Sequence, residues 1–462
     1  MKILLIQPPK APITIGGEDL FIYEPLALEY VAAGVARDHD VRILDLRLEK
    51  KLAQTLDEFR PDTVGITAYT VHVNTARKLF EQIKMWNPGA LTVVGGHHAT
   101  IAPEDFCVPA IDLIVRGEGV FAFQQIVERF ARGEHYDGIP GVAFARAGAL
   151  VQTDYAPVVD LDAIPFPERK LTARYRARYF SEWMKPLASI RTSKGCPYRC
   201  SFCALWKLTG GRYLKRAPEK IVEELRGIDE EDVFFADDES LVDAARMKTL
   251  AQLIRDAGIR KRYFLYGRSD TIAKNPDLLE LWKTIGLERV FIGLEFFRDQ
   301  DLQAIRKGST ADDNARAVKM AQDLGIEIYA TLIVRPDFQR DDFAALRAYC
   351  RALNLNFAGF PVLTPLPGTD LHAQVKDRLL TRDYDYTDFI HTILPTALPL
   401  GEFYREYYQL AANAIPPARQ LAILKKFPLR DLAPALKRSA QWVQRLRTIH
   451  LDYANAPRQA QV

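Results

Sequence analysis

Two stretches of alternating strand and helix patterns constrain the fold of this 462-residue chain more than any other feature. In residues 1–135, short apolar runs lie at 2–7, 41–46, 63–67, 91–94 and 113–116, and helical periodicity separates them at 25–37, 48–59, 74–86 and 121–132. Such alternation is typical of a parallel sheet with helices on both faces. We therefore predict an α/β chain in which residues 1–135 form a doubly wound, Rossmann-like domain.

In a doubly wound sheet, ligands bind beyond the carboxyl ends of the strands. The loops at those ends contain glycines, which allow close approach of a ligand to the backbone. No G-x-G-x-x-G pattern follows the first strand, which argues against a dinucleotide as the ligand. We expect the loop histidines His72, His97 and His98 to pack or to form hydrogen bonds rather than to bind a metal. The candidate binding residues are Gln7, Pro8, Pro9, Tyr69, His72, Gly95, Gly96, His97, Gly117, Glu118 and Gly119.

A second alternation fills residues 188–380, with strand patterns at 189–192, 232–236, 264–268, 289–292, 327–334 and 357–361. Six strand–helix units predict a partial (β/α)6 barrel, whose site lies at the carboxyl ends of the strands. Residues 136–187 are predicted to form a connector between the two domains. It contains a hairpin (138–144 and 150–159) and a proline-containing linker (160–169). Residues 381–462 read as a helical C-terminal region that contains many aromatic residues.

Three of the five cysteines lie within eight residues, as Cys196, Cys200 and Cys203 in a C-x3-C-x2-C spacing. Thiolates are soft ligands that suit iron–sulfur clusters and zinc. A structural zinc site usually needs four protein ligands, and no histidine or fourth cysteine follows at zinc-finger spacing. A cubane cluster held by three cysteines has one iron that lacks a protein ligand. We therefore predict an iron–sulfur cluster whose open iron binds a small molecule.

The cysteine spacing, with the aromatic Phe202 before the last cysteine, resembles the radical S-adenosylmethionine (SAM) superfamily. The resemblance implies a 4Fe-4S cluster on the three cysteines, SAM on the open iron, and one-electron cleavage of SAM to an adenosyl radical. Residues 331–337 depart from the family's I-x-G-x-P-G-E-T segment, so no adenine contact is assigned there. The SAM-binding residues that the resemblance implies are Asp237, Asp238 and Glu239 at the ammonium group, Arg268 at the carboxylate and Glu295 at the ribose.

The segments VVGGHHATIAPEDF (93–106) and DLIVRGEGVFAF (112–123) resemble the cobalamin-binding domain that precedes many radical SAM enzymes. The resemblance implies cobalamin as the ligand of the loops in residues 1–135. The D-x-H-x-x-G motif of methionine-synthase-type domains is absent, so no histidine is marked as the lower cobalt ligand. The segment LTPLPGT (363–369) is frequent in the cobalamin-dependent branch of the superfamily.

Together these motifs imply a cobalamin-dependent radical SAM methyltransferase. It would methylate an unactivated carbon of a hydrophobic small molecule, with a flavodoxin or ferredoxin as electron donor. A hopanoid lipid methylated at C-3 is the first substrate that the resemblance implies. Alternatives are a tetrapyrrole (as for a bacteriochlorophyll methylase or an anaerobic cyclase), a non-methylating member that forms or contracts a ring, and a non-catalytic cobalamin-binding protein. The three cluster cysteines argue against the last.

The net charge of +3 is too small to predict a nucleic-acid partner. No apolar run is long enough for a transmembrane helix, and the N-terminus does not resemble a signal peptide, so we expect a cytoplasmic protein. After Arg419, basic residues alternate with leucines and a tryptophan, which is typical of a helix lying on a membrane surface. We therefore expect either peripheral contact with the inner membrane face or, more commonly for such a pattern, packing on the barrel.

Overall fold

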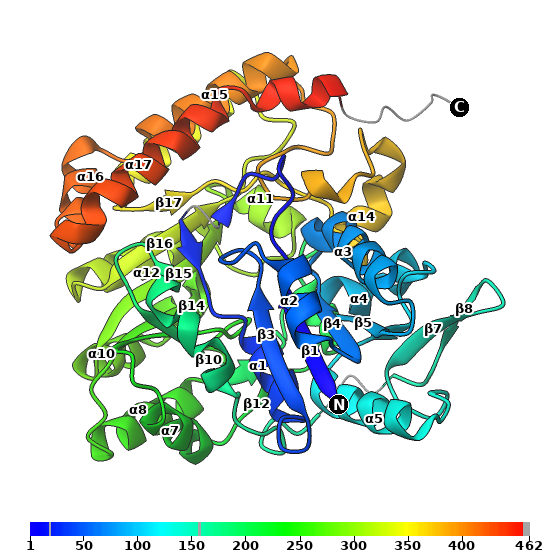
Figure 1. Cartoon of the computed structure of the whole chain (residues 1–462). Coiled ribbons are helices and arrows are strands. Elements are labelled where there is room, and N and C mark those ends of the chain that lie inside the picture. The colour runs from blue at the N-terminus through cyan, green and yellow to red at the C-terminus, as the bar shows by residue number, and fades with distance from the viewer. Residues whose placement is uncertain (18–19, 156–158, 456–462) are drawn as a thin grey trace.

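The computed structural model describes residues 1–17, 20–155 and 159–455 of the chain. Figure 1 shows a sheet formed by the N-terminal third beside a second sheet formed by the middle of the chain, with C-terminal helices along one side. The predicted α/β class, with a doubly wound domain, a partial barrel and a helical C-terminal region, is confirmed. The domain boundaries at 135, 187 and 380 stay predictions.

The first sheet has the strand order β3-β1-β4-β5-β6-β7-β8. All five predicted strands are present and parallel. The order reverses between β1 and β4, so the switch point lies between the ends of these two strands. Apolar residues from both faces of the sheet are buried beneath the flanking helices. The parallel strands are β1 (Lys2–Gln7), β3 (Asp40–Asp45), β4 (Thr63–Thr67), β5 (Leu91–Gly95) and β6 (Leu113–Val115).

The helices of this domain follow the predicted periodicity, but two of them differ in extent. The helix predicted at 25–37 ends at Ala33. The helix predicted at 48–59 begins only at Leu52, because the peptide N–H groups of Leu48 and Glu49 both donate to the carbonyl of Asp45 and form a turn. A short helix also starts at His97, directly after β5. The helices are α1 (Leu26–Ala33), α2 (Leu52–Phe59), α3 (Val73–Trp86), α4 (His97–Ile101) and α5 (Gly119–Arg132).

The predicted connector contributes to the first sheet instead of only linking the domains. Its hairpin, β7 (Val142–Arg146) and β8 (Ala149–Gln152), extends the sheet because β7 pairs antiparallel with β6. The strand predicted for 150–159 ends at Gln152, and residues 156–158 lie outside the described residues. The linker leads into a 3-10 helix, η4 (Arg169–Arg178), and into β9 (Phe180–Ser181), which pairs with β2 (Phe21–Ile22).

The second sheet is the predicted six-stranded partial barrel, with all strands parallel and in chain order. Alternate residues of each strand, such as Val233 and Phe235, pack outward against helices. The residues between them, such as Phe234, face the inside of the barrel. The strands are β10 (Leu187–Ile190), β13 (Asp232–Phe235), β14 (Arg262–Arg268), β15 (Leu287–Glu295), β16 (Glu327–Leu332) and β17 (Ala358–Gly359).

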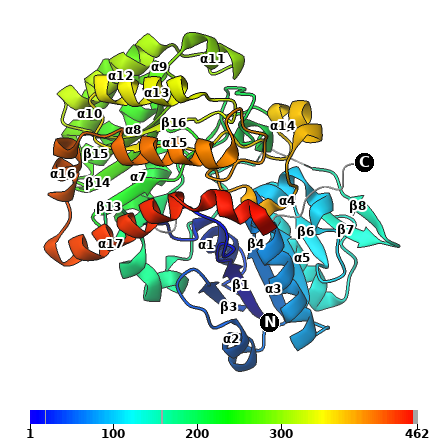
Figure 2. The same cartoon turned by 90° about the horizontal axis from the view of Figure 1, so that it is seen from above.

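Helices cover the outer face of the barrel (Figure 2), namely α7 (Pro218–Arg226), α8 (Ala244–Asp256), α10 (Pro276–Thr284), α12 (Ala311–Asp323) and α13 (Arg340–Ala352). The C-terminal region adds α15 (Leu400–Asn413), α16 (Pro417–Leu424) and α17 (Leu429–Leu446). Helix α15 packs on the barrel, and the Tyr407 hydroxyl donates to the Phe360 carbonyl over 2.7 Å. Within the described part of the chain, no helix is long and apolar enough to span a bilayer.

Candidate active site

The three clustered cysteines lie in the loop that follows β10 and the two-residue strand β11 (Ser193–Lys194). Cys200 is buried, and Cys196 and Cys203 are half-buried. Burial raises the pKa of Cys196 to about 11 and that of Cys203 to about 12, and the neighbouring Cys200 thiol adds to both shifts. Nowhere in the described residues do three His, Cys, Asp or Glu side chains converge closely enough to hold one metal ion. Three soft donors on one loop fit a multi-iron cluster.

Two neighbouring carboxylates after β13 hold the start of the cysteine loop. Asp237 accepts hydrogen bonds from the peptide N–H groups of Thr192 (2.7 Å) and Ser193 (2.8 Å) and from the Thr192 hydroxyl (2.6 Å). Asp238 accepts from the peptide N–H of Gly195 over 2.6 Å. Both Asp237 oxygens are therefore used within the protein, which favours a positioning role for this residue over the predicted SAM contact.

Arg268, at the end of β14, fastens the middle of the same loop. Its guanidinium stacks on the Tyr198 ring at 3.6 Å, and one of its N–H groups lies 4.0 Å from the Cys200 sulfur. Its Nε donates to Asp270 over 2.9 Å, and its other terminal nitrogen donates to the carbonyl of Lys307. The predicted SAM-binding arginine is thus in contact with the loop that carries the cysteines.

Glu239 has a buried oxygen that lacks a donor. Its Oε1 accepts from the Arg268 peptide N–H over 3.0 Å, whereas Oε2 has no hydrogen-bond partner among the described residues. Burial raises the pKa of this carboxyl to about 7. A buried acceptor without a donor is costly unless a ligand supplies one. The orphaned oxygen fits the ammonium group of SAM.

Glu295 lies at the end of β15 in a strained backbone conformation, with φ of 58°. Its Oε1 accepts from Lys307 Nζ over 2.8 Å, and both side chains are buried. Gly293 makes room for this pair, since a Cβ atom there would lie 2.4 Å from Glu295 Oε1 and 3.1 Å from Lys307 Nζ. Left-handed backbone at a non-glycine residue is concentrated at functional sites.

Glu118 joins the two sheets. It follows β6 of the first sheet, and its Oε2 accepts from Lys194 over 3.0 Å and from Arg191 over 3.2 Å, both on the segment that leads into the cysteine loop. Burial opposes the charge, but Arg191 and Lys194 lower the pKa of Glu118 to about 2. The carboxylate is therefore engaged by the barrel side of the molecule. This contact was not anticipated by its predicted role in binding cobalamin.

The remaining predicted loop residues lie at the carboxyl edge of the first sheet. Tyr69 is 51% exposed and packs edge-on against His97 at 4.8 Å and near His72 at 5.9 Å. Burial lowers the pKa of both histidines to about 4, with smaller contributions from Arg47 for His72 and from Lys194 for His97. Both rings are therefore neutral at pH 7. Gln7 at the end of β1 and Pro8 beside it are buried, and Pro9 is half-buried.

Two of the predicted glycines are needed for the backbone itself. Gly96 has φ of 103°, and a Cβ there would lie 2.8 Å from the backbone of Ala68. Gly117 has φ of 83°, and its Cβ would lie 2.5 Å from the Tyr155 ring. Gly95 ends β5 and Gly119 begins α5. The neighbouring His98 is buried, with 3.1 Å to the Thr70 hydroxyl and 2.9 Å to Asp105, which confirms its expected hydrogen-bonding role.

The sequence analysis missed a set of rings that lines the inside of the barrel. Tyr23 contacts Phe234 (4.6 Å between centroids), Phe234 contacts Tyr266 (5.2 Å), Tyr266 contacts Phe291 (4.7 Å), and Phe291 contacts Tyr329 (5.2 Å). We call these five residues the aromatic belt. The signal was present in β13 to β16, where the belt residues alternate with the apolar residues that face the helices. The hydroxyls of Tyr266 and Tyr329 have no protein partner among the described residues.

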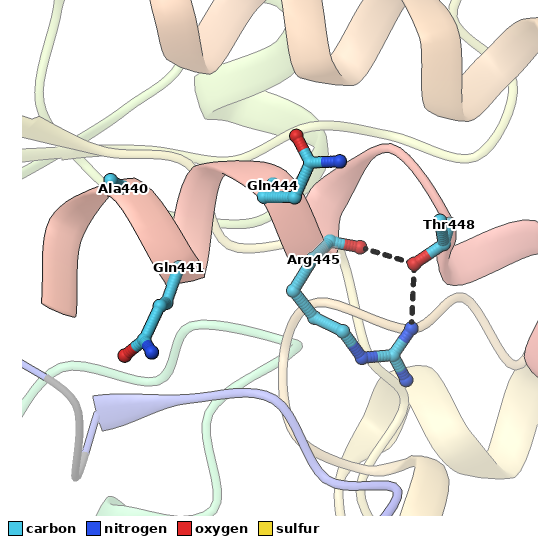
Figure 3. Close-up of a pocket in the computed structure, with 5 residues that line it drawn as sticks. All are labelled: Ala440, Gln441, Gln444, Arg445 and Thr448. Carbon is cyan, nitrogen blue, oxygen red and sulfur yellow. Dashed lines mark hydrogen bonds between the residues drawn. The ribbon is translucent and has the colours of Figure 1, made fainter. Parts of the chain in front are cut away.

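Two surface hollows lie away from this site. One, of about 590 Å³, is lined by Ala440, Gln441, Gln444, Arg445 and Thr448 of α17 and the turn after it (Figure 3). The other, of about 350 Å³, lies beside Pro365, His372 and Tyr384. Neither hollow is lined by a residue of the cysteine loop. The site is instead the region where the carboxyl ends of both sheets meet.

Comparison with known proteins identifies two protein families within the chain. Residues 13–127 match the B12 binding domain, and residues 190–350 match the Radical SAM superfamily. The chain is 34% identical to the hopanoid C-3 methylase of Methylococcus capsulatus, over 88% of this chain and 78% of that protein. It is 27% identical to the anaerobic magnesium-protoporphyrin IX monomethyl ester cyclase of Cereibacter sphaeroides, over 84% of this chain and 66% of that protein. A solved structure with a similar fold is that of the radical S-adenosylmethionine methyltransferase TsrM from Kitasatospora setae, with cobalamin and a 4Fe-4S cluster bound. The superposition includes 98% of this chain and 99% of the TsrM chain. Its TM-score is 0.73 at 19% identity, so this likeness concerns the fold.

Proposed function

Because this chain belongs to the cobalamin-dependent radical SAM methyltransferases, whose cofactors are a 4Fe-4S cluster, SAM and cobalamin, we propose that it methylates an unactivated carbon of a rigid polycyclic lipid, a hopanoid at C-3. The observation that carries this substrate class is the aromatic belt. Stacked and edge-on rings form a broad aromatic surface inside the barrel. Tyr266 of the belt lies two residues before Arg268, which contacts the cysteine loop. Aromatic surfaces of this kind bind large apolar ring systems through area burial and ring contacts.

We propose that each cofactor is bound by a separate group of residues of this chain. We assign the cluster to Cys196, Cys200 and Cys203, and SAM to Asp238, Glu239, Arg268 and Glu295, with Asp237 positioning the loop. When bound, these groups supply one-electron cleavage of SAM and a transferable methyl group. A flavodoxin or ferredoxin is the proposed electron donor. The cobalamin-facing residues that we propose are Gln7, Pro8, Pro9, Tyr69, His72, Gly95, Gly96, His97, Gly117 and Gly119, with Glu118 acting through Arg191 and Lys194.

The chain's own residues orient the substrate and limit access of water. Phe234 and Phe291 supply rings without polar groups, while Tyr266 and Tyr329 keep their hydroxyls inside the barrel. Burial raises the pKa of both tyrosines, so their phenol groups stay protonated and remain hydrogen-bond donors at neutral pH. A lining of this kind holds an apolar skeleton in one orientation and excludes water from the reacting carbon.

A tetrapyrrole is the second candidate, because such macrocycles also stack on aromatic rings. Its propionate groups, however, need cationic partners. Next to the belt lies Arg289, which is fully buried, is paired with Glu182 and lies over the rings of Trp183 (4.7 Å) and Tyr329 (5.0 Å). The Glu182 carboxylate neutralises this guanidinium, although Nε and one terminal nitrogen have no hydrogen-bond partner among the described residues. A neutralised pair attracts a carboxylate less than a free cation would, which favours an uncharged polycycle over a carboxylated one.

The test is a substrate comparison under anaerobic conditions. The protein is reconstituted with iron, sulfide and cobalamin and is then given a reductant and SAM with a trideuterated methyl group. Parallel reactions contain either a hopanoid extract or magnesium-protoporphyrin IX monomethyl ester. The proposal predicts a trideuterated methylhopanoid by mass spectrometry and no such product from Cys200→Ala. A labelled or cyclised tetrapyrrole together with unlabelled hopanoid would contradict the substrate assignment.

A further inference from the structure

We propose that the outer face of α16 and α17 docks on a bilayer surface that contains anionic phospholipid. This docking face consists of an apolar stripe edged by basic side chains. Its apolar members are Leu421, Leu429, Ala433, Leu436 and Ala440, and its basic members are Lys425, Arg430 and Lys437. The inference concerns where the protein resides and is independent of which substrate the barrel takes.

The stripe is a second apolar face that packing within the protein does not explain. Leu429, Ala433, Leu436 and Ala440 are spaced by four, three and four residues, which places them along one side of α17. Leu429 is 90% exposed, Leu436 46% and Leu421 56%. The opposite side of α17 already faces the protein, through the buried Leu446 and the half-buried Trp442. Packing of α17 on the protein therefore explains the apolar residues on its inner side, but it does not explain the exposed stripe on its outer side.

Charge complementarity favours an anionic surface as the partner. Residues 417–462 contain nine Lys and Arg against two Asp and no Glu, whereas residues 1–416 contain 53 Lys and Arg against 57 Asp and Glu. Within the described chain, Lys425 and Lys437 have no acidic partner, and Arg430 has only a 3.5 Å contact with Asp431. Basic residues beside exposed leucines are the pattern by which peripheral helices bind anionic membranes.

The docking face is held firmly to the barrel. Lys426 forms ion pairs with Glu288 (2.8 Å) and Glu327 (3.0 Å), and Lys185 pairs with Asp431 (3.0 Å). Figure 1 shows α16 and α17 along the outer edge of the molecule. The stripe ends at Ala440, which also lines the hollow of Figure 3. A rigid, preformed face binds without the cost of ordering a helix.

Ile423 and Phe427, from the same segment, pack inward against Trp183. That apolar cluster continues through Phe234 and Phe264 to the belt. Docking would therefore bring the membrane to the end of the barrel where the internal aromatic surface begins.

The experiment is flotation of the full-length protein with vesicles of phosphatidylcholine alone or with 30% phosphatidylglycerol. We expect binding to the anionic vesicles only, and weaker binding in 0.5 M NaCl because salt screens surface charge. Lys425→Glu with Lys437→Glu should lower the partition coefficient by at least about 25-fold, at about fivefold for each basic residue lost. Leu429→Asp should lower it by about tenfold or more.

Two control variants distinguish binding through the docking face from non-specific binding of other exposed side chains to the vesicles. Met85→Asp removes an apolar side chain that is 76% exposed on α3, and Lys319→Glu reverses an exposed charge on α12; both should bind like the wild type. Circular dichroism confirms that each variant is folded. Equal binding to both vesicle types, or binding unchanged in the α16–α17 variants, would overturn the inference. A third outcome would also overturn it: the protein does not bind vesicles, sediments as a dimer, and becomes a monomer in Leu429→Asp. The apolar stripe would then be the contact between two copies of the chain.

Discussion

Replacing Glu118 by glutamine tests the connection between the first sheet and the cysteine loop. The wild-type carboxylate lies between Arg191 and Lys194, and its pKa falls from 4.5 to about 2. At 1.36 kcal/mol per pKa unit, that shift corresponds to about 3 kcal/mol of stabilisation. The amide oxygen of glutamine still accepts one hydrogen bond, so we expect a loss of about 2–3 kcal/mol.

Hydrogen exchange of peptides that cover residues 191–203 measures this loss locally. If the loop opens by itself, exchange should become about 30- to 150-fold faster in Glu118→Gln. Because the folded-state pKa is depressed, the stabilisation is fully present above pH 4.5 and is lost as the pH falls towards 2. The difference between variant and wild type should therefore be constant from pH 8 to 5 and smaller below pH 4.5.

Glu134→Gln, at an exposed position just after α5, is the control and should leave exchange of the loop unchanged. Unchanged exchange at residues 191–203 in Glu118→Gln would refute the reasoning. It would show that the ion pairs do not hold the loop and that the role of Glu118 must be sought in ligand contact alone.

Three further variants test other parts of the site. Glu239→Gln should make the SAM-free protein more stable than the wild type at pH 8 but not at pH 4. Because the folded-state pKa is raised from 4.5 to about 7, the wild type loses stability as the pH rises from about 4.5 to 7, and the full loss of about 3 kcal/mol is present above pH 7. Thermal unfolding at the two pH values checks this. The same variant should bind SAM more weakly in equilibrium dialysis. Tyr329→Ala should raise the KM for the polycyclic substrate by about tenfold or more while 5′-deoxyadenosine formation continues, which product analysis by mass spectrometry can follow. Arg289→Met should lower the free energy of unfolding by about 3–5 kcal/mol because Glu182 is left as a buried unpaired charge, and Arg289→Met combined with Glu182→Leu should recover most of that loss in denaturant titrations. Equal losses in the single and double variants would show that the pair is not the cause.

Sequence periodicity predicted the parallel strands of both sheets well because they lie between layers of helices and are buried on two sides. The five parallel strands of the seven-stranded first sheet and the six strands of the second are each marked by an apolar run. The cysteine loop was equally visible, since three soft ligands at fixed spacing have few structural uses. The hairpin at 142–152 was found, but its pairing with β6 was not, because a local pattern does not specify a non-local partner.

Roles that depend on contacts between distant segments could not be read from the sequence. Glu118 lies in a glycine-rich loop that resembles a ligand-binding segment, and only the fold brings it to Arg191 and Lys194. Asp237 and Asp238 are adjacent in the sequence, yet the first is saturated by loop hydrogen bonds and the second accepts one from Gly195. The aromatic belt was overlooked because its members come from separate strands, one ring at a time.

The most direct test of the account is the product stoichiometry of a single anaerobic reaction with SAM, reductant, cobalamin and a hopanoid as the proposed substrate. Methylation of an unactivated carbon by this family requires one SAM as methyl donor and one as radical source. We therefore predict S-adenosylhomocysteine, 5′-deoxyadenosine and methylated product in a ratio near 1:1:1, measured by quantitative mass spectrometry. Formation of 5′-deoxyadenosine with neither S-adenosylhomocysteine nor a methylated product would contradict the account and would indicate a radical SAM reaction without methyl transfer.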